Sequence, residues 1–253
     1  MSCSAIMFSL FLTSPCPQGG SVDANEAVAN AIANPQRPAE DVARDTDRKP
    51  DKVLSFFEVK PGMTVFEMFA GSGYYTEILD SLVGEDGKVI AHNNQAYMSY
   101  VGEAHQKRHA NGRLANTETV LSEANDLEFE EDSLDAALLV LTWHDFLFAD
   151  KEQGWPAIDT GLLQDKFCAA MKPGAVLGLV DHVANPGGDP AEAAMTLHRV
   201  DPQQVKDSFA GTCFALDAEA KFLRNKIDDH TLSVFDPSIR GKTDRFVYKL
   251  VRK

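Results

Sequence analysis

Short apolar runs alternate with segments of helical periodicity along most of this sequence, and that alternation limits the folds open to it. The run 134–141 is apolar at nearly every position, as expected for a central parallel strand covered on both faces. The pattern predicts an α/β fold in which a mostly parallel sheet is wound on both faces by helices. We predict seven strands, over residues 64–69, 88–91, 119–122, 134–141, 176–180, 214–222 and 245–251.

Helical segments are predicted between these strands. Pro50 suits the first turn of a helix that ends near Phe57, and Asp201 followed by Pro202 is a strong helix start. Apolar side chains recur at helical spacing after the first strand. We therefore expect helices over residues 50–57, 75–82, 95–109 and 155–171, and from residue 202 onward.

The first 37 residues differ in character from the rest and are predicted to be a leader and a flexible arm. Residues 5–12 form an apolar run of signal-peptide size, and Val22-Asp23-Ala24 would serve as a cleavage site. No basic residue precedes the run, so a disordered or mis-assigned amino terminus is an equal alternative. The expected location is the cytoplasm, or the periplasm if residues 1–24 act as a signal peptide. Residues 38–253 form one predicted domain.

Charge and composition exclude several kinds of partner. The formal net charge is −14, whereas binding to a nucleic-acid backbone relies on clustered Lys and Arg. No stretch has the ~20 apolar residues that a membrane span requires. The four cysteines have no paired spacing, so we expect buried thiols instead of a zinc site or a disulfide framework. A small molecule is the expected partner.

A glycine loop between the first predicted strand and the next helix carries most of the functional information. Gly71 and Gly73 stand where ligands approach the carboxyl ends of the strands in open α/β sheets. A dinucleotide-binding loop requires a third small residue and, about 20 residues on, an acid for the ribose. Thr76 and Asn93 occupy those places. A nicotinamide-dependent oxidoreductase is therefore disfavoured.

The chain resembles the class I S-adenosylmethionine (SAM)-dependent methyltransferases, and most of all a bacterial group of predicted methyltransferases, over residues 38–253. The resemblance rests on Glu67, Gly71 and Gly73, on the turn Met171-Lys172-Pro173-Gly174, and on the closing segment 228–250. It implies a Rossmann-like methyltransferase fold, doubly wound and seven-stranded, with an antiparallel last strand. It also implies SAM as cofactor and methyl transfer to a small acceptor.

The resemblance assigns roles at the cofactor site. Glu67 would hold the methionine amino group, Asn93 the ribose hydroxyls, and Glu123 the adenine amino group. Phe69 replaces the usual first glycine of the loop, and Asn93 replaces the usual acid. Both departures favour an alternative in which the chain binds SAM without turnover. The full predicted cofactor set is Glu67, Ala70, Gly71, Gly73, Tyr74, Asn93, Glu123 and Ala124.

Acceptor-side residues are expected after the fourth and fifth strands. His144 is the candidate general base because imidazole titrates near neutral pH, with Asp145 orienting it or acting itself. Asp145 as a simple helix cap is the alternative. The predicted substrate-binding residues are Trp143, His182 and His198, and a core anchor is an equal alternative for Trp143. His and carboxylate groups suit metals, but their spacing matches no compact metal motif, so no metal ion is predicted. The candidates to pair with a carboxylate group of SAM or of the acceptor are Arg44, Arg48 and Arg240.

Overall fold

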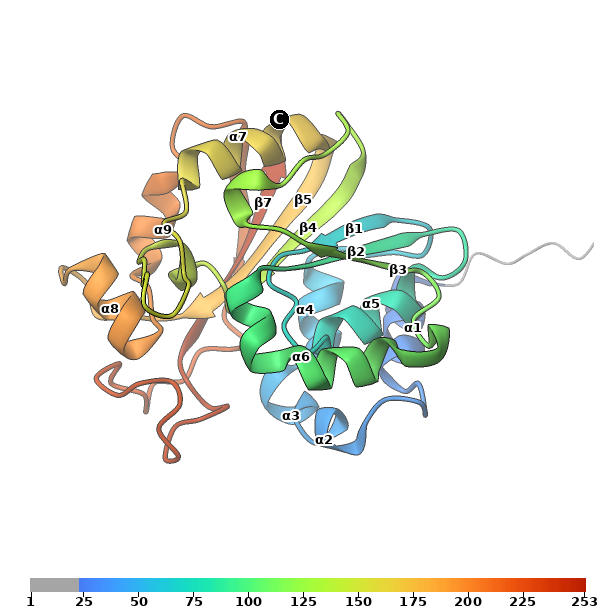
Figure 1. Ribbon diagram of the computed structural model, residues 1–253, viewed down its shortest axis with the longest axis horizontal. Coiled ribbons are helices and arrows are strands. Elements are labelled where there is room, and N and C mark those ends of the chain that lie inside the picture. Colours follow the sequence, from blue (N-terminus) through green and yellow to red (C-terminus); the bar gives the residue numbers. More distant parts are fainter. Residues whose placement is uncertain (1–22) are drawn as a thin grey trace, which may run out of the picture.

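The computed structural model describes residues 23–253, and its centre is a single seven-stranded sheet (Figure 1). The strand order is β3-β2-β1-β4-β5-β7-β6, and β7 runs antiparallel to both of its neighbours. The predicted doubly wound sheet with an antiparallel last strand is confirmed. The strands are β1 Thr64–Glu67, β2 Lys88–Asn93, β3 Thr117–Leu121, β4 Leu134–Val140, β5 Met171–His182, β6 Phe214–Ala220 and β7 Arg245–Arg252.

Helices cover both faces of the sheet and divide the core into two layers. On one face α1 (Ala24–Ile32), α4 (Pro50–Phe56) and α5 (Tyr74–Val83) pack against side chains such as Leu138. On the other face α7 (Thr160–Ala170) and α9 (Pro202–Ser208) pack against side chains such as Leu139. Successive residues of β4 therefore enter opposite layers, as the pleat of a strand requires. The remaining helices are α2 Ala39–Val42, α3 Asp45–Arg48, α6 Gln95–His109 and α8 Pro190–Leu197.

The segment predicted as a loose arm is partly folded onto the domain. Asp23 caps α1 by accepting a hydrogen bond from the Asn25 N–H, and Val28 and Ala31 are each only 2% exposed. Both belong to the core layer that contains α4 and α5. The prediction of a flexible arm is therefore wrong for residues 24–32, because one face of α1 packs into the core through small side chains. The predicted signal peptide falls almost wholly on residues 1–22, outside the described residues.

Two local predictions also differ from the structure. The helix predicted from residue 155 begins at Thr160, because the Asp159 side chain accepts from the Leu162 N–H and fixes the start there. The turn Lys172-Pro173-Gly174 lies inside β5, where the pairing with β4 shifts register. The sheet therefore continues through residues that the sequence predicts to precede it.

Cys168 and Cys213 form a disulfide, with their Cα atoms 5.9 Å apart. This corrects the expectation of isolated thiols. The bond joins α7 to the segment just before β6, 45 residues further along the chain. Sequence spacing alone did not indicate the pair because the fold, and not the local chain, brings the two residues together.

The strand order sets the position of the ligand site. From β1 the chain proceeds outward through β2 and β3, then crosses back to β4 on the other side of β1. In open α/β sheets the crevice at this reversal point, outside the carboxyl ends of the strands, is where ligands bind. Among the helices of residues 23–253, none has the length and apolar composition needed to cross a membrane.

Candidate active site

A cavity of about 750 Å³ lies at the reversal point of the sheet. The loop after β1 forms one wall, and the segment after β4 forms another. Further lining comes from Arg44 and Arg48, from the end of α8, and from Val234, Phe235 and Arg240. A cavity of this size is within the range of small-molecule and cofactor sites. The segments that the sequence predicts as cofactor side and acceptor side therefore meet in one space.

The loop after β1 has the left-handed backbone that glycine favours. Gly71 has φ +60° and Gly73 has φ +90°, and the side of Gly71 where a Cβ would lie is open, with Phe69 O as the nearest atom at 4.0 Å. Phe69 also has positive φ, at +47°, although it carries a side chain. Left-handed backbone at a non-glycine residue costs about 1–2 kcal/mol, so the surrounding contacts must hold Phe69 in place.

Those contacts are aromatic. The Phe69 ring stacks on Tyr97 with ring centres 4.9 Å apart, and packs against Trp155 at 5.4 Å. Phe146 and His92 complete the surround. The side chain at the usual first glycine therefore points into an aromatic cluster and is only 4% exposed.

Glu67, the last residue of β1, is a buried acid at the cavity wall. It is 4% exposed, and its carboxylate accepts a hydrogen bond of 2.6 Å from the Thr76 hydroxyl. Burial raises the pKa of Glu67 to about 7, although the Thr76 hydrogen bond and the charges of Arg108 and Arg48 act in the opposite direction. A cationic ligand group beside this carboxylate would favour its ionised form.

The predicted cofactor residues divide into two groups. Glu67, Ala70, Gly71 and Tyr74 line the cavity. The other four do not line it: Gly73, Asn93, Glu123 and Ala124. The methionine end of the predicted SAM site therefore faces the cavity, whereas the residues predicted to hold the ribose and adenine do not line it.

Local bonding explains that division. The Asn93 side chain is bound to the loop: its Oδ1 accepts from the Gly71 N–H at 2.8 Å, and its Nδ2 donates to Gly71 O at 3.1 Å. Glu123 accepts from the Asn94 side chain at 3.3 Å. Gly73 closes the loop, and a Cβ on it would lie 2.6 Å from Cδ of Arg108. Asn93 in this position shapes the glycine loop.

Arginines give the cavity a positive side. Arg44, Arg48 and Arg240 all line it. The Arg48 guanidinium lies 4.5 Å above the ring of Tyr74, and Arg44 lies 5.0 Å above the same ring. Within residues 23–253, Arg44 pairs with Asp41, while neither Arg48 nor Arg240 forms an ion pair with a carboxylate. Guanidinium groups in this setting are suited to bind a carboxylate ligand group.

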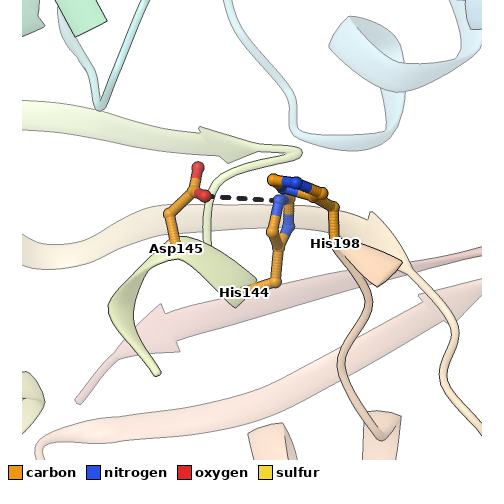
Figure 2. Close-up of side chains that lie close together, drawn as sticks. All are labelled: His144, Asp145 and His198. Atoms are coloured by element: carbon orange, nitrogen blue, oxygen red, sulfur yellow. Dashed lines mark ion pairs between the residues drawn. The ribbon is translucent and has the colours of Figure 1, made fainter. Parts of the chain in front are cut away.

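His144 and Asp145 lie on the opposite wall, in the short helical turn after β4, and both are buried. Asp181, at the end of β5, is fully buried and accepts from both the His144 N–H and His144 Nδ1, at 2.9 and 2.8 Å. Asp145 accepts from the Tyr97 hydroxyl at 2.7 Å. Its Oδ1 lies 3.4 Å from His144 Nε2, as Figure 2 shows. The fold thus fixes both side chains from several elements.

The protonation state of His144 differs from the one that the sequence predicts. Burial lowers the pKa of the ring, but the carboxylates of Asp181 and Asp145 outweigh it and raise the pKa to about 9. Burial also raises the pKa of Asp145. Burial and the charge of His144 lower the pKa of His198 to about 4. In the free protein the two carboxylates therefore favour the protonated ring, which must lose the proton on Nε2 before it can act as a base or bind a metal ion.

The predicted substrate-binding residues are only partly brought together. His182 and His198 line the cavity, with their ring centres 6.0 and 5.4 Å from that of His144. Trp143 does not: it is 3% exposed and packs between Phe146 and Phe209 in the core. Its prediction as a substrate residue is wrong because its side chain enters the layer beneath α9.

Two residues that matter here were missed or undervalued from sequence. Tyr97 stacks on Phe69 and holds Asp145. It lies in α6, and only its position three residues after the capping Asn94 gave a local signal. Asp181, the buried partner of His144, is not among the residues predicted above. The sequence signal that could have identified Asp181 is its position as an acidic residue at the end of a buried strand.

Comparison with known proteins agrees with this architecture. The model of the ubiE/COQ5 methyltransferase family matches residues 45–151. A SAM-dependent methyltransferase from Aquifex aeolicus is 22% identical with a TM-score of 0.58, covering 88% of this chain and 98% of its own. Geranyl diphosphate C-methyltransferase from Streptomyces coelicolor is 10% identical with a TM-score of 0.55, covering 88% and 84%. A search among curated protein sequences gave no match.

A doubly wound sheet with a glycine loop and a cavity at its reversal point is the arrangement in which open α/β proteins bind ligands. The family match covers the segment from α3 to the turn after β4, which holds most of the cavity wall. The chain has the fold of the SAM-dependent methyltransferases, and the ubiE/COQ5 methyltransferase family model matches its residues 45–151.

Proposed function

We propose that this protein transfers the methyl group of SAM to a small acceptor molecule bound in the same cavity. One observation carries the proposal: a single cavity is lined by Glu67 and the glycine loop on one side and by His144, Asp145 and His198 on the other. Methyl transfer is an in-line displacement, so its two reactants must meet in one space with fixed alignment.

The methionine end of SAM suits the wall built by β1 and α3. The carboxylate of Glu67 would accept from the SAM ammonium group, and Arg48, with Arg44 beside it, would bind the SAM carboxylate. SAM supplies an activated methyl group on a positive sulfur. The open side of Gly71 gives the cofactor close access to the loop backbone.

The acceptor is proposed to enter between the apolar mouth and the histidines. Phe148, Met195 and Phe235 line this part of the cavity, and Phe235 is 56% exposed. Apolar side chains around a few polar groups are typical of sites that bind small organic molecules. The net charge of −14 argues against a nucleic-acid acceptor.

A second candidate is a SAM-binding or regulatory protein without turnover. Asn93 favours this candidate, because both the oxygen and the nitrogen of its side-chain amide are hydrogen-bonded to the backbone of Gly71. The expected partner of the ribose hydroxyls is therefore already occupied. A nicotinamide-dependent oxidoreductase remains disfavoured by Thr76, which is bound to Glu67.

Isotope transfer separates these functions. The protein is incubated with methyl-labelled SAM and pools of small metabolites, and labelled products are identified by mass spectrometry. We expect protein-dependent label in a small molecule, strongly reduced in Glu67→Gln and unchanged in Glu128→Gln, an exposed acid-to-amide control. SAM binding with no labelled product in any pool would favour the regulatory protein. Binding of NAD without binding of SAM would contradict both.

A further inference from the structure

Two imidazoles and a carboxylate converge at the acceptor side of the cavity. One ligand atom from each of His144, Asp145 and His198 lies within 4.8 Å of the others, and Figure 2 shows the three groups directed toward one another. His144 and Asp145 come from the turn after β4, whereas His198 follows α8, more than 50 residues further along the chain. The sequence spacing predicted no metal here because only the fold brings the three together.

We propose that His144, Asp145 and His198 bind a divalent transition-metal ion whose remaining coordination positions face the acceptor part of the cavity. Two imidazoles with one carboxylate suit Zn²⁺, Fe²⁺ or Co²⁺ better than Mg²⁺ or Ca²⁺, which prefer sets made only of oxygen. Three protein ligands with an open position are the arrangement of catalytic sites, whereas structural zinc sites are closed by four.

The distances suit such an ion. Ligand atoms about 2.0–2.1 Å from a tetrahedral ion lie roughly 3.4 Å from one another. His144 Nε2 and Asp145 Oδ1 are 3.4 Å apart. The ligand atoms of the group lie up to 4.8 Å apart, so one of the side chains would move by roughly 1 Å to reach metal-binding geometry. His198 is only half-buried at the end of α8 and has room for that shift.

Outer hydrogen bonds already orient two of the ligands. Asp181 accepts from His144 Nδ1 at 2.8 Å, which leaves Nε2 as the nitrogen that faces Asp145. The Tyr97 hydroxyl donates to Asp145 Oδ2 at 2.7 Å, which leaves Oδ1 facing His144. A carboxylate bound to the far nitrogen of a histidine ligand is the usual support of a metal site, where it fixes the ring and increases its basicity.

The local charge also favours a cation. Asp145 and Asp181 are 6% and 0% exposed, and within residues 23–253 neither carboxylate has a Lys or Arg partner; His144 is the ion-pair partner of both. Burying two carboxylates is costly unless positive charge compensates them. A divalent ion in place of the proton on His144 Nε2 would supply that charge.

The ion would act on the acceptor, and this part of the inference rests on the proposed methyl transfer. A divalent ion lowers the pKa of an oxygen or sulfur that it binds. The acceptor would therefore carry a hydroxyl or thiol, which loses its proton to solvent. Its lone pair then forms a bond to the methyl carbon as the carbon–sulfur bond of SAM breaks, and the electron pair of that bond stays on sulfur.

Cobalt binding tests the site without any need for SAM or acceptor. The full-length protein is treated with a chelator, desalted and titrated with Co²⁺, and the visible absorption bands of the bound ion are followed. We expect one equivalent to bind. His198→Ala and Asp145→Asn should each weaken binding at least about 100-fold, and Tyr97→Phe about 10-fold, because loss of outer partners costs 10–100-fold. Thermal unfolding of each variant checks that it is folded.

A matched control is present on α6. His105 and His109 stack with ring centres 4.3 Å apart, and such a pair can capture metal ions without function. The double variant His105→Ala/His109→Ala should bind Co²⁺ like the wild type. The proposal is overturned if no stoichiometric binding occurs, if binding survives both His198→Ala and Asp145→Asn, or if it is lost in the α6 control. Calorimetry of SAM with the metal-free protein tests the proposed function separately, so the two failures are distinguishable.

Discussion

Replacing Glu67 by Gln should change how the stability of the free protein depends on pH. The carboxylate is buried at the end of β1, and burial raises its pKa from the ordinary 4.5 to about 7, against the opposing effect of Thr76. Between these two values the folded protein holds a proton that the unfolded chain has released. The stabilisation is therefore fully present below the lower value and is lost as the pH rises through the upper one.

The size of the effect follows from the shift. One pKa unit corresponds to about 1.4 kcal/mol, so between pH 5 and pH 8 the wild type should lose roughly 2–3 kcal/mol more stability than Glu67→Gln. Urea unfolding of both proteins at the two pH values measures this difference, and other titrating groups cancel in the comparison. Gln can still accept from Thr76, so packing is retained. Parallel pH profiles for the two proteins would refute the reasoning, and Glu128→Gln, at an exposed site, should follow the wild type.

Two further predictions concern the scaffold. A Cβ added at Gly178 of β5 would lie 2.5 Å from the ring of Phe57, so Gly178→Ala should lower the free energy of unfolding by about 1–3 kcal/mol. The control Gly188→Ala should have little effect, because no atom lies within 4 Å of the added Cβ. Equal urea midpoints for the two variants would contradict the packing seen at Gly178. Replacing Cys168 and Cys213 together by Ser should lower the free energy of unfolding by up to about 4 kcal/mol, because the disulfide closes a loop of 45 residues. If reduction of the wild type leaves its melting temperature unchanged, the disulfide does not constrain the chain.

The fold could be predicted from the sequence because its signals are local. The apolar run of β4 and the Asp201-Pro202 helix start each specify an element without reference to distant residues. The packing of α1 could not be predicted in this way. Its buried face consists of small residues such as Ala27 and Ala31, which give a weak periodic signal and depend on α4 and α5 for a surface to cover.

The site was predictable in its position and less so in its chemistry. Strand ends and glycines point to the segments around Gly71 and His144, and both residues line the cavity. Protonation and orientation depend on partners from other strands: Asp181 decides the state of His144, and Tyr97 decides which oxygen of Asp145 is free. Asn93 illustrates the same limit, because a side chain that suits a ribose also suits the backbone of the adjacent loop.

Calorimetric titration with SAM tests the central claim most directly, namely that the cavity beside Glu67 is a SAM site. At pH 8 we expect one SAM to bind per chain. Glu67→Gln should weaken binding by about 10- to 150-fold, because a hydrogen bond between charged groups contributes roughly 1.5–3 kcal/mol. Glu128→Gln should bind SAM like the wild type. The account is contradicted if the folded wild type does not bind SAM, or if Glu67→Gln binds it with unchanged affinity.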